Sequence, residues 1–299
     1  MQPALTAAGH DGAQQGEGLF IKPSSRQEID FYQWLTTHPT SLNEFVPQFM
    51  GTLVEGRPPA APGTSAGPEP LSSSNNLPAQ TADPRAQPLL VLEDLCAGFH
   101  SPSVMDVKLG RQLWDAATPP AKRERLQNVA AATTSGALGY RIAGLSFINN
   151  AGERENIGKQ FGRAATAETI EEHLAVFWPQ IANEYVRDAC LAGIIARLED
   201  LHAALSEQRL EMHSASVLLL YEGDLKTLVE TTDKLMAEDD VPEEINSSED
   251  ESFEPRILDV RLIDFAHATQ ANCPDKDTLS GLSNLIAALK NLLAANADR

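Results

Sequence analysis

Two stretches that cannot form a packed core divide this chain, and they decide which residues are available to build a fold. Residues 57–88 contain eight of the 19 prolines, together with a run of serines and asparagines. Residues 238–254 contain nine acidic residues and no basic one. Such compositions bury too little apolar surface to offset their ordering entropy. We therefore expect a disordered Pro/Ser-rich insertion at 57–88 and an exposed acidic loop at 238–254. A disordered tail is expected at 1–15, which lacks periodicity.

The segments between these stretches alternate short apolar strands with helices. Ser25 and Glu28 have the spacing of a capping box, which predicts a helix that begins there and turns Ile29, Tyr32 and Leu35 to one face. Apolar spacing predicts a long helix over 183–208 and a closing helix over 278–293. Short strands are predicted at 19–22, 51–54, 89–92, 104–109, 216–221 and 257–263.

The strand over 104–109 carries charged side chains at alternate positions. Because successive side chains of a strand point to opposite faces, Asp106 and Lys108 share one face, about 6.6 Å apart at about 3.3 Å per residue. Met105, Val107 and Leu109 occupy the other face. Two charged groups side by side on one face indicate a site.

Charge is distributed unevenly along the 299 residues, whose net charge is −19. Such an acidic protein is an unlikely partner for nucleic acid or anionic lipid. Residues 101–163, however, contain nine basic and five acidic residues, a local charge of +4. This pattern fits a small anionic ligand, although a solvated basic face has the same composition.

Other features limit the class of protein. There is no apolar run long enough for a membrane span and no secretion signal at the N-terminus, so a soluble intracellular protein is expected. The three cysteines, Cys96, Cys190 and Cys273, are scattered, which favours neither a disulfide framework nor a zinc site.

Three sequence blocks together carry a resemblance to a known family. The sequence contains neither a Walker A motif nor a Gly-x-Gly-x-x-Gly after a strand. Residues 102–110 instead match PxxxDxKxG, residues 216–223 read SVLLLYEG, and residues 261–267 read RLIDFAH. In this order the blocks resemble the inositol polyphosphate kinase family, over about residues 19–293 outside the two low-complexity stretches. The family often has two serines before the leucines, and here the first is Ala215.

The resemblance implies an α+β fold with two lobes, like that of protein kinases, that binds ATP and Mg²⁺. It assigns residues 16–98 to an N-lobe with an antiparallel sheet and residues 99–299 to a larger C-lobe, with the inositol phosphate-binding segment at 111–182. The expected activity is phosphorylation of soluble inositol polyphosphates at ring hydroxyls, from the trisphosphate to the tetrakis- and pentakisphosphate.

On the nucleotide side, the resemblance implies roles for seven residues. Asp264 would bind the metal ion with Ser216 beside it. Lys22 would contact the nucleotide phosphates, with Glu28 as its acidic partner. The backbone of Glu93 and Leu95 would bind adenine, and Asp106 would bind ribose.

On the acceptor side, Lys108 is expected to contact both the acceptor and the transferred phosphate, so Lys108 and Asp264 are the expected catalytic residues. The other expected contacts of the acceptor are Lys122, Arg125, Lys159, Arg163 and His267. For Lys122 and Arg125 a solvated helix face is an equal alternative, and His267 fits a packing role as well as a ligand role.

The compact segment over 111–182 resembles the multikinases more than the hexakisphosphate kinases, which remain the alternative within the family. A scaffold or transcription-complex partner and a nucleotide-binding pseudokinase are alternatives from other classes. The resemblance further implies a monomer found in the nucleus and cytoplasm, with the acidic loop as a possible contact for protein partners.

Overall fold

The computed structural model describes residues 2–3, 12–53, 88–178, 184–238 and 256–297. The strands of this part of the chain form two antiparallel five-stranded sheets and one two-stranded sheet. The first sheet, with strand order β1-β2-β3-β5-β4, makes up the N-lobe together with α1 and a short 3₁₀ helix. Its elements are β1 (Gln2–Pro3), β2 (Gln14–Gly16), β3 (Leu19–Pro23), α1 (Arg26–Thr37), the 3₁₀ helix (Ser41–Phe45), β4 (Phe49–Leu53) and β5 (Leu89–Glu93).

The second sheet, with strand order β11-β10-β6-β7-β8, is the centre of the C-lobe. Its strands are β6 (Pro102–Leu109), β7 (Tyr140–Ile148), β8 (Arg154–Ile157), β10 (Ser216–Glu222) and β11 (Leu258–Ile263). A small sheet of β9 (Leu210–Met212) and β12 (Ala268–Gln270) lies beside α1.

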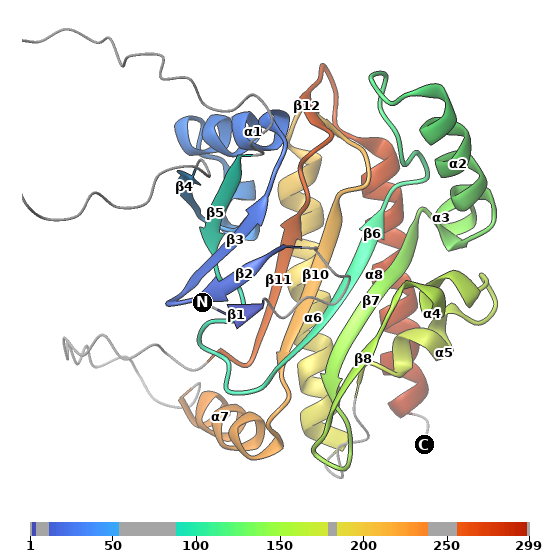
Figure 1. The fold of residues 1–299 in the computed structure, drawn as a ribbon. Helices are drawn as coiled ribbons and strands as arrows, with labels where there is room; N and C mark the ends of the chain where they lie inside the picture. The colour runs from blue at the N-terminus through green and yellow to red at the C-terminus, as the bar shows by residue number, and fades with distance from the viewer. Residues whose placement is uncertain (1, 4–11, 54–87, 179–183, 239–255, 298–299) are drawn as a thin grey trace, which may run out of the picture.

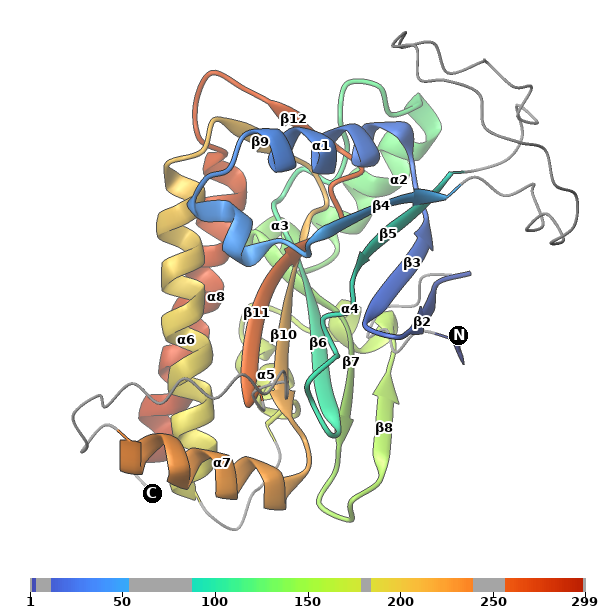
Figure 2. The same ribbon diagram turned by 90° about the vertical axis from the view of Figure 1, so that its left-hand side faces the viewer.

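Helices α6 and α8 cover one face of the C-lobe sheet, and the N-lobe strands lie on its other side (Figures 1 and 2). Helices α3 and α4 pack against β7, α2 packs against α3, and α5 packs against α8 (Figure 1). The helices of the C-lobe are α2 (Pro120–Ala131), α3 (Thr134–Leu138), α4 (Lys159–Ala164), α5 (Ile170–Ala175), α6 (Glu184–Ser206), α7 (Leu225–Glu238) and α8 (Lys276–Ala297).

The alternation predicted for residues 104–109 is confirmed in β6. Met105, Val107 and Leu109 are buried in the main hydrophobic core, which they share with α6 and α8. The opposite face of the strand carries Asp106 and Lys108. One face of β6 therefore packs in the core, and the other carries the charged groups on the side of the N-lobe.

Most of the predicted elements are present with shifted ends, and the long helix and closing helix are α6 and α8. Two expectations need correction. The tail expected over 1–15 is ordered in part, because Gln2–Pro3 forms β1 and pairs with β2 at Gln14–Gly16, and Gln15 Nε2 donates to Asp94 Oδ2 at 2.7 Å. The capping box is half formed: the Ser25 hydroxyl caps α1, but the carboxylate of Glu28 is used elsewhere.

The expectations for the Pro/Ser-rich insertion and for the acidic loop lie, apart from Pro88 and Glu238, outside the described residues. Within the described part of the chain, no helix combines the length and the apolar composition of a membrane span.

Candidate active site

Asp264 lies directly after β11 and holds two lysines from different lobes. Lys22 Nζ on β3 donates to Asp264 Oδ1 at 3.0 Å, and Lys108 Nζ on β6 donates to Oδ2 at 3.3 Å. Asp264 has a left-handed backbone (φ 68°), which Asp and Asn tolerate better than most residues. This conformation ends the strand at the point where the two lobes meet, and it makes Asp264 the link between them.

Glu28 completes this cluster from helix α1. Its Oε1 is 2.9 Å from Lys22 Nζ and also accepts a hydrogen bond from the backbone N–H of Phe265 at 3.2 Å. Oε2 accepts from the Ser24 hydroxyl at 2.6 Å. The carboxylate is therefore fully engaged in the site, which is why it does not return to the start of its own helix.

Burial by itself would lower the pKa of Lys22, but the charges of Asp264 and Glu28 outweigh it and raise the pKa above its ordinary value. The side chains of Lys22 and Glu28 are only 8% and 4% exposed. Lys22 is thus a permanent cation, held rigidly by two carboxylates next to the interlobe site.

The register of the C-lobe sheet sets the position of Lys108. Ser216 at the start of β10 is opposite Lys108 on one side and opposite Ile263, the residue before Asp264, on the other. Lys108 Nζ donates to Ser216 Oγ at 3.0 Å and to the Ser214 carbonyl at 3.3 Å. The three residues expected around the transferred phosphate are therefore neighbours, although two lie on different strands and the third directly follows another strand.

The connection between the lobes combines an apolar wall with a backbone donor. Leu95 and Val104 pack with Leu220 in a small cluster, separate from the main core, that also contacts Leu218 and Ile263. Among the described residues, none accepts a hydrogen bond from the backbone N–H of Leu95. Apolar side chains beside an unused N–H suit a planar heterocycle such as adenine.

Glu93 has a second role at this connection. Its carboxylate pairs with Arg256 at 3.4 Å and with Arg261 at 3.5 Å, and it accepts from the backbone N–H of Gln48 at 3.2 Å. Arg261 also pairs with Asp259 at 2.8 Å. The side chain therefore ties the end of β5 to β11, while the backbone at this position is the part expected to meet the base.

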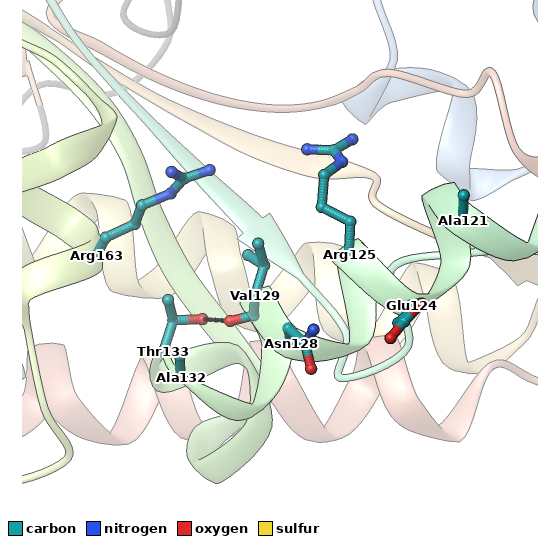
Figure 3. Close-up of a pocket in the computed structure, with 8 residues that line it drawn as sticks. All are labelled: Ala121, Glu124, Arg125, Asn128, Val129, Ala132, Thr133 and Arg163. Atoms are coloured by element: carbon teal, nitrogen blue, oxygen red, sulfur yellow. Dashed lines mark hydrogen bonds between the residues drawn. The ribbon is translucent and has the colours of Figure 1, made fainter.

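A pocket of about 530 Å³ lies between α2 and α4 (Figure 3). The guanidinium groups of Arg125 and Arg163 extend to the same side of it. Gly162 explains how Arg163 reaches this position, because a Cβ there would lie 1.9 Å from the Ile142 carbonyl oxygen. Only glycine lets α4 pack so close to β7. The lining residues are Ala121, Glu124, Arg125, Asn128, Val129, Ala132, Thr133 and Arg163.

Arg141 on β7 lies between this pocket and the nucleotide side. It is opposite Lys108 in the sheet, and its Nη1 donates to Ser135 Oγ at 2.8 Å. Burial and the nearby charge of Arg163 lower the pKa of Arg141, whereas the charge of Asp106 raises it, so its guanidinium lies near both residues. Lys108 is thus opposite Arg141, Arg141 interacts with Arg163, and Arg163 shares the pocket with Arg125, and we call this series of neighbours the line of cations.

His267 is held by a residue that the sequence did not single out. Its Nδ1 is 2.6 Å from Asp115 Oδ2, in the loop between β6 and α2. Asp115 Oδ1 accepts from the Thr118 hydroxyl at 2.6 Å. These hydrogen bonds, first from Thr118 and then from His267, lower the pKa of Asp115 to about 2, so the carboxylate is ionised at neutral pH.

The predicted residues do not all gather at one place. Lys22, Glu28, Lys108, Ser216 and Asp264 form one contact network, and Arg125 and Arg163 share the pocket. Lys122 and Lys159 are exposed on α2 and α4 and do not line that pocket. For these two lysines the alternative of a solvated face fits the structure better.

The protein supplies few metal ligands of its own. In the described residues, no three His, Cys, Asp or Glu side chains converge as a metal site. The carboxylate of Asp264 beside the hydroxyl of Ser216 suits a cation that takes most of its ligands from substrate phosphates and water, as Mg²⁺ does.

Comparison with known proteins agrees with the geometry of the site. An inositol polyphosphate multikinase of Saccharomyces cerevisiae is 30% identical over 94% of this chain and 95% of its own length. Inositol hexakisphosphate kinase 2 of Mus musculus is 31% identical, but over 60% of this chain and 41% of its own. The crystal structure of the S. cerevisiae multikinase Ipk2 with ADP and Mn²⁺ has a TM-score of 0.68, with 24% identity, over 92% of this chain and 99% of that one. Residues 89–290 match the family described as inositol polyphosphate kinase, and the chain belongs to that family.

Proposed function

We propose that this protein is an ATP-dependent kinase that phosphorylates soluble inositol polyphosphates at more than one ring hydroxyl. The observation that carries the proposal is the line of cations that joins the Lys22–Asp264–Lys108 cluster to the pocket of Arg125 and Arg163. A nucleotide phosphate at one end and a polyphosphorylated ring at the other would meet at Lys108. Such positioning and charge stabilisation is most of what phosphoryl transfer requires.

On the nucleotide side, the apolar cluster around Leu95 and Val104 would hold adenine, and the free N–H of Leu95 would donate to it. Asp106 lies two residues before Lys108 on β6, which suits an acceptor for the ribose hydroxyls. Lys22, fixed by Glu28, would bind the phosphates. Each of these proposed contacts would be made by a residue whose position the fold determines without a ligand.

For the metal ion we propose Mg²⁺ bound by Asp264 next to Ser216. When bound, the ion neutralises charge on the transferred phosphoryl group. Lys108 contacts both Asp264 and Ser216. Its ammonium group would therefore provide a second cation beside the transferred phosphoryl group, on the side of the acceptor.

Among the possible acceptors, inositol tris- and tetrakisphosphates fit best. The pocket is open and contains Glu124 as well as two arginines, so its charge suits fewer phosphates than a fully phosphorylated ring carries. The near full-length match to a multikinase, against a partial match to a hexakisphosphate kinase, supports the same choice.

Product analysis tests the proposal. The purified protein with ATP and Mg²⁺ is incubated separately with inositol trisphosphate and with inositol hexakisphosphate, and the products are resolved by phosphate number. We expect tetrakis- and pentakisphosphate from the first substrate and little turnover of the second. If only the hexakisphosphate is turned over, and pyrophosphates are formed, the result would favour a hexakisphosphate kinase. The absence of turnover of both substrates would overturn the proposal.

A further inference from the structure

The contact between Asp115 and His267 connects two segments of the chain, the one that follows Lys108 and the one that follows Asp264. From Lys108 the chain runs through the loop after β6 to Asp115, and from Asp264 it runs three residues to His267. The segments are 3.3 Å apart at Lys108 Nζ and Asp264 Oδ2, and they meet again at 2.6 Å between Asp115 and His267. Helix α2, which carries Arg125, begins five residues after Asp115. The pair therefore ties the loop that leads into α2 to the segment that follows Asp264.

The hydrogen bonds of Asp115 determine which nitrogen of His267 carries a proton. The Thr118 hydroxyl accepts from the backbone N–H of Asp115 at 3.1 Å and donates to its Oδ1 at 2.6 Å, so the hydroxyl has a fixed direction. Oδ2 belongs to an ionised carboxylate, which only accepts. Nδ1 of His267 must therefore be the donor, and in the neutral ring Nε2 keeps its lone pair.

Nε2 is left without a protein partner. None of the described residues hydrogen-bonds to it, and the side chain of His267 is 29% exposed. The proposed acceptor site extends from Lys108 to the pocket of Arg125, and Nε2 is the ring nitrogen of His267 that remains for a contact with a ligand there.

We infer that Asp115 is a positioning residue which, with Thr118, fixes the ring of His267 so that Nε2 accepts the proton of the attacking inositol hydroxyl. The inference rests on the proposed function. In the step, the hydroxyl oxygen forms a bond to the γ-phosphorus of ATP, and the bond from that phosphorus to the bridging oxygen breaks with its electron pair on ADP. The hydroxyl proton passes to Nε2 and then to solvent when the product leaves. Of these two residues only His267 touches the substrate, and Asp115 acts through it.

The substitution Asp115→Asn tests this arrangement with little change in shape. The asparagine has one carbonyl oxygen, which the directed Thr118 hydroxyl would take, so its NH₂ group would face Nδ1. This geometry favours the tautomer with the proton on Nε2, which cannot accept another. We expect kcat to fall about 10²-fold, the lower end of the range for general base catalysis, with little change in ADP affinity. Asp30→Asn, which alters an exposed ion pair with Arg26 on α1, is the matched control and should leave kcat unchanged.

Two measurements separate a positioning role from a merely structural one. Nitrogen-15 NMR of the imidazoles, with the His267 signals assigned by their loss in His267→Gln, should show protonation at Nδ1 in the wild type and at Nε2 in Asp115→Asn. A double-mutant cycle should show that Asp115→Asn has no further effect on kcat once His267 is glutamine. A wild-type ring protonated at Nε2, or additive effects of the two substitutions, would overturn the inference.

The design separates two kinds of failure. If the wild-type protein does not phosphorylate inositol phosphates, the proposed function is wrong. If it does and Asp115→Asn has the kcat of the wild type, only this inference is wrong. Should Asp115→Asn fail to fold, the wild-type spectrum alone still shows which nitrogen carries the proton.

Discussion

The cluster around Asp264 and the pocket between α2 and α4 both contain cations, but their surroundings differ. In the cluster, the side chains of Lys22, Glu28, Asp264 and Lys108 are 4–22% exposed, and each is paired with another member. In the pocket, Arg125 is exposed and Arg163 is half-buried, and neither forms an ion pair with a described residue.

This difference indicates different tasks. A buried, fully paired cluster is rigid before any ligand arrives, so little reorganisation is needed when charge moves during the reaction. Cations without counter-ions in a protein of net charge −19 are available for an anion that brings several charges of its own. We therefore expect substitutions in the cluster to lower turnover and substitutions in the pocket to weaken acceptor binding.

Asp264→Asn should have the largest effect. Asparagine tolerates the left-handed backbone at this position, so the fold should survive, whereas the charge that pairs with both lysines and is proposed to bind the metal is lost. We expect kcat to fall at least about 10³-fold, with a thermal midpoint within about 5 °C of the wild type, a shift of roughly 1 kcal/mol for a domain of moderate size. Activity within tenfold of the wild type would mean that Asp264 is not the metal ligand.

Lys108→Met comes next, because Lys108 belongs to the cluster but also stands at the start of the line of cations. Methionine keeps the apolar stem and removes the charge beside Asp264 and Ser216. We expect kcat to fall about 10²-fold to 10³-fold and the KM of inositol trisphosphate to rise, with ATP affinity little changed. If ATP affinity is lost while the acceptor KM stays the same, Lys108 belongs to the nucleotide site and the comparison fails.

The pocket should respond in the opposite way. Arg163→Ala should raise the acceptor KM about tenfold, the loss expected for one hydrogen bond between charged groups, and should change kcat little. Lys122→Ala is the matched control, because Lys122 lies on the same helix as Arg125 but does not line the pocket, and its effect should be smaller. Steady-state kinetics at low and high salt should show the effect of Arg163→Ala shrinking as salt rises. Equal effects of the two substitutions would indicate a diffuse basic surface in place of a pocket.

The same division explains how much was predictable from the sequence. Lys108, Ser216 and Asp264 stand in recognisable blocks at the ends of apolar strands, so both the strands and the cluster were predicted. Glu28 was assigned two roles, and the structure selects the ion pair with Lys22 over the cap of its own helix. The cluster was predictable because each residue sits where a strongly patterned element begins or ends.

The acceptor side was less predictable, because its elements leave a weaker pattern. Helix α2 buries only Ala130, so it has no apolar periodicity to detect. The position of Arg141 depends on the pairing of β7 with β6, which has an irregularity between Asp106 and Val107 that no local pattern reveals. Asp115 and His267 are 152 residues apart in the sequence, so their contact follows only from the fold.

The smallest effect is expected from removing residues 54–87. Leu53 on β4, just before this segment, and Leu89 on β5, two residues after it, are antiparallel partners, so a short Gly-Ser turn can join the two strands without moving either. Loop-closure entropy depends only weakly on loop length, which predicts a stability change of about 1 kcal/mol or less. Of the site residues on this sheet, Lys22 is paired with Leu90 and Glu93 with Leu19, and these partners remain after the deletion. We therefore expect kcat, both KM values and ADP affinity within about twofold of the wild type, since each of these constants depends on groups that stay in place.

The measurement is steady-state kinetics together with thermal unfolding. The control is a variant in which Gly-Ser repeats of the same length replace the segment. If the shortened protein loses nucleotide affinity while the control keeps it, the N-lobe needs the length of this segment, and if both lose affinity, it needs the sequence.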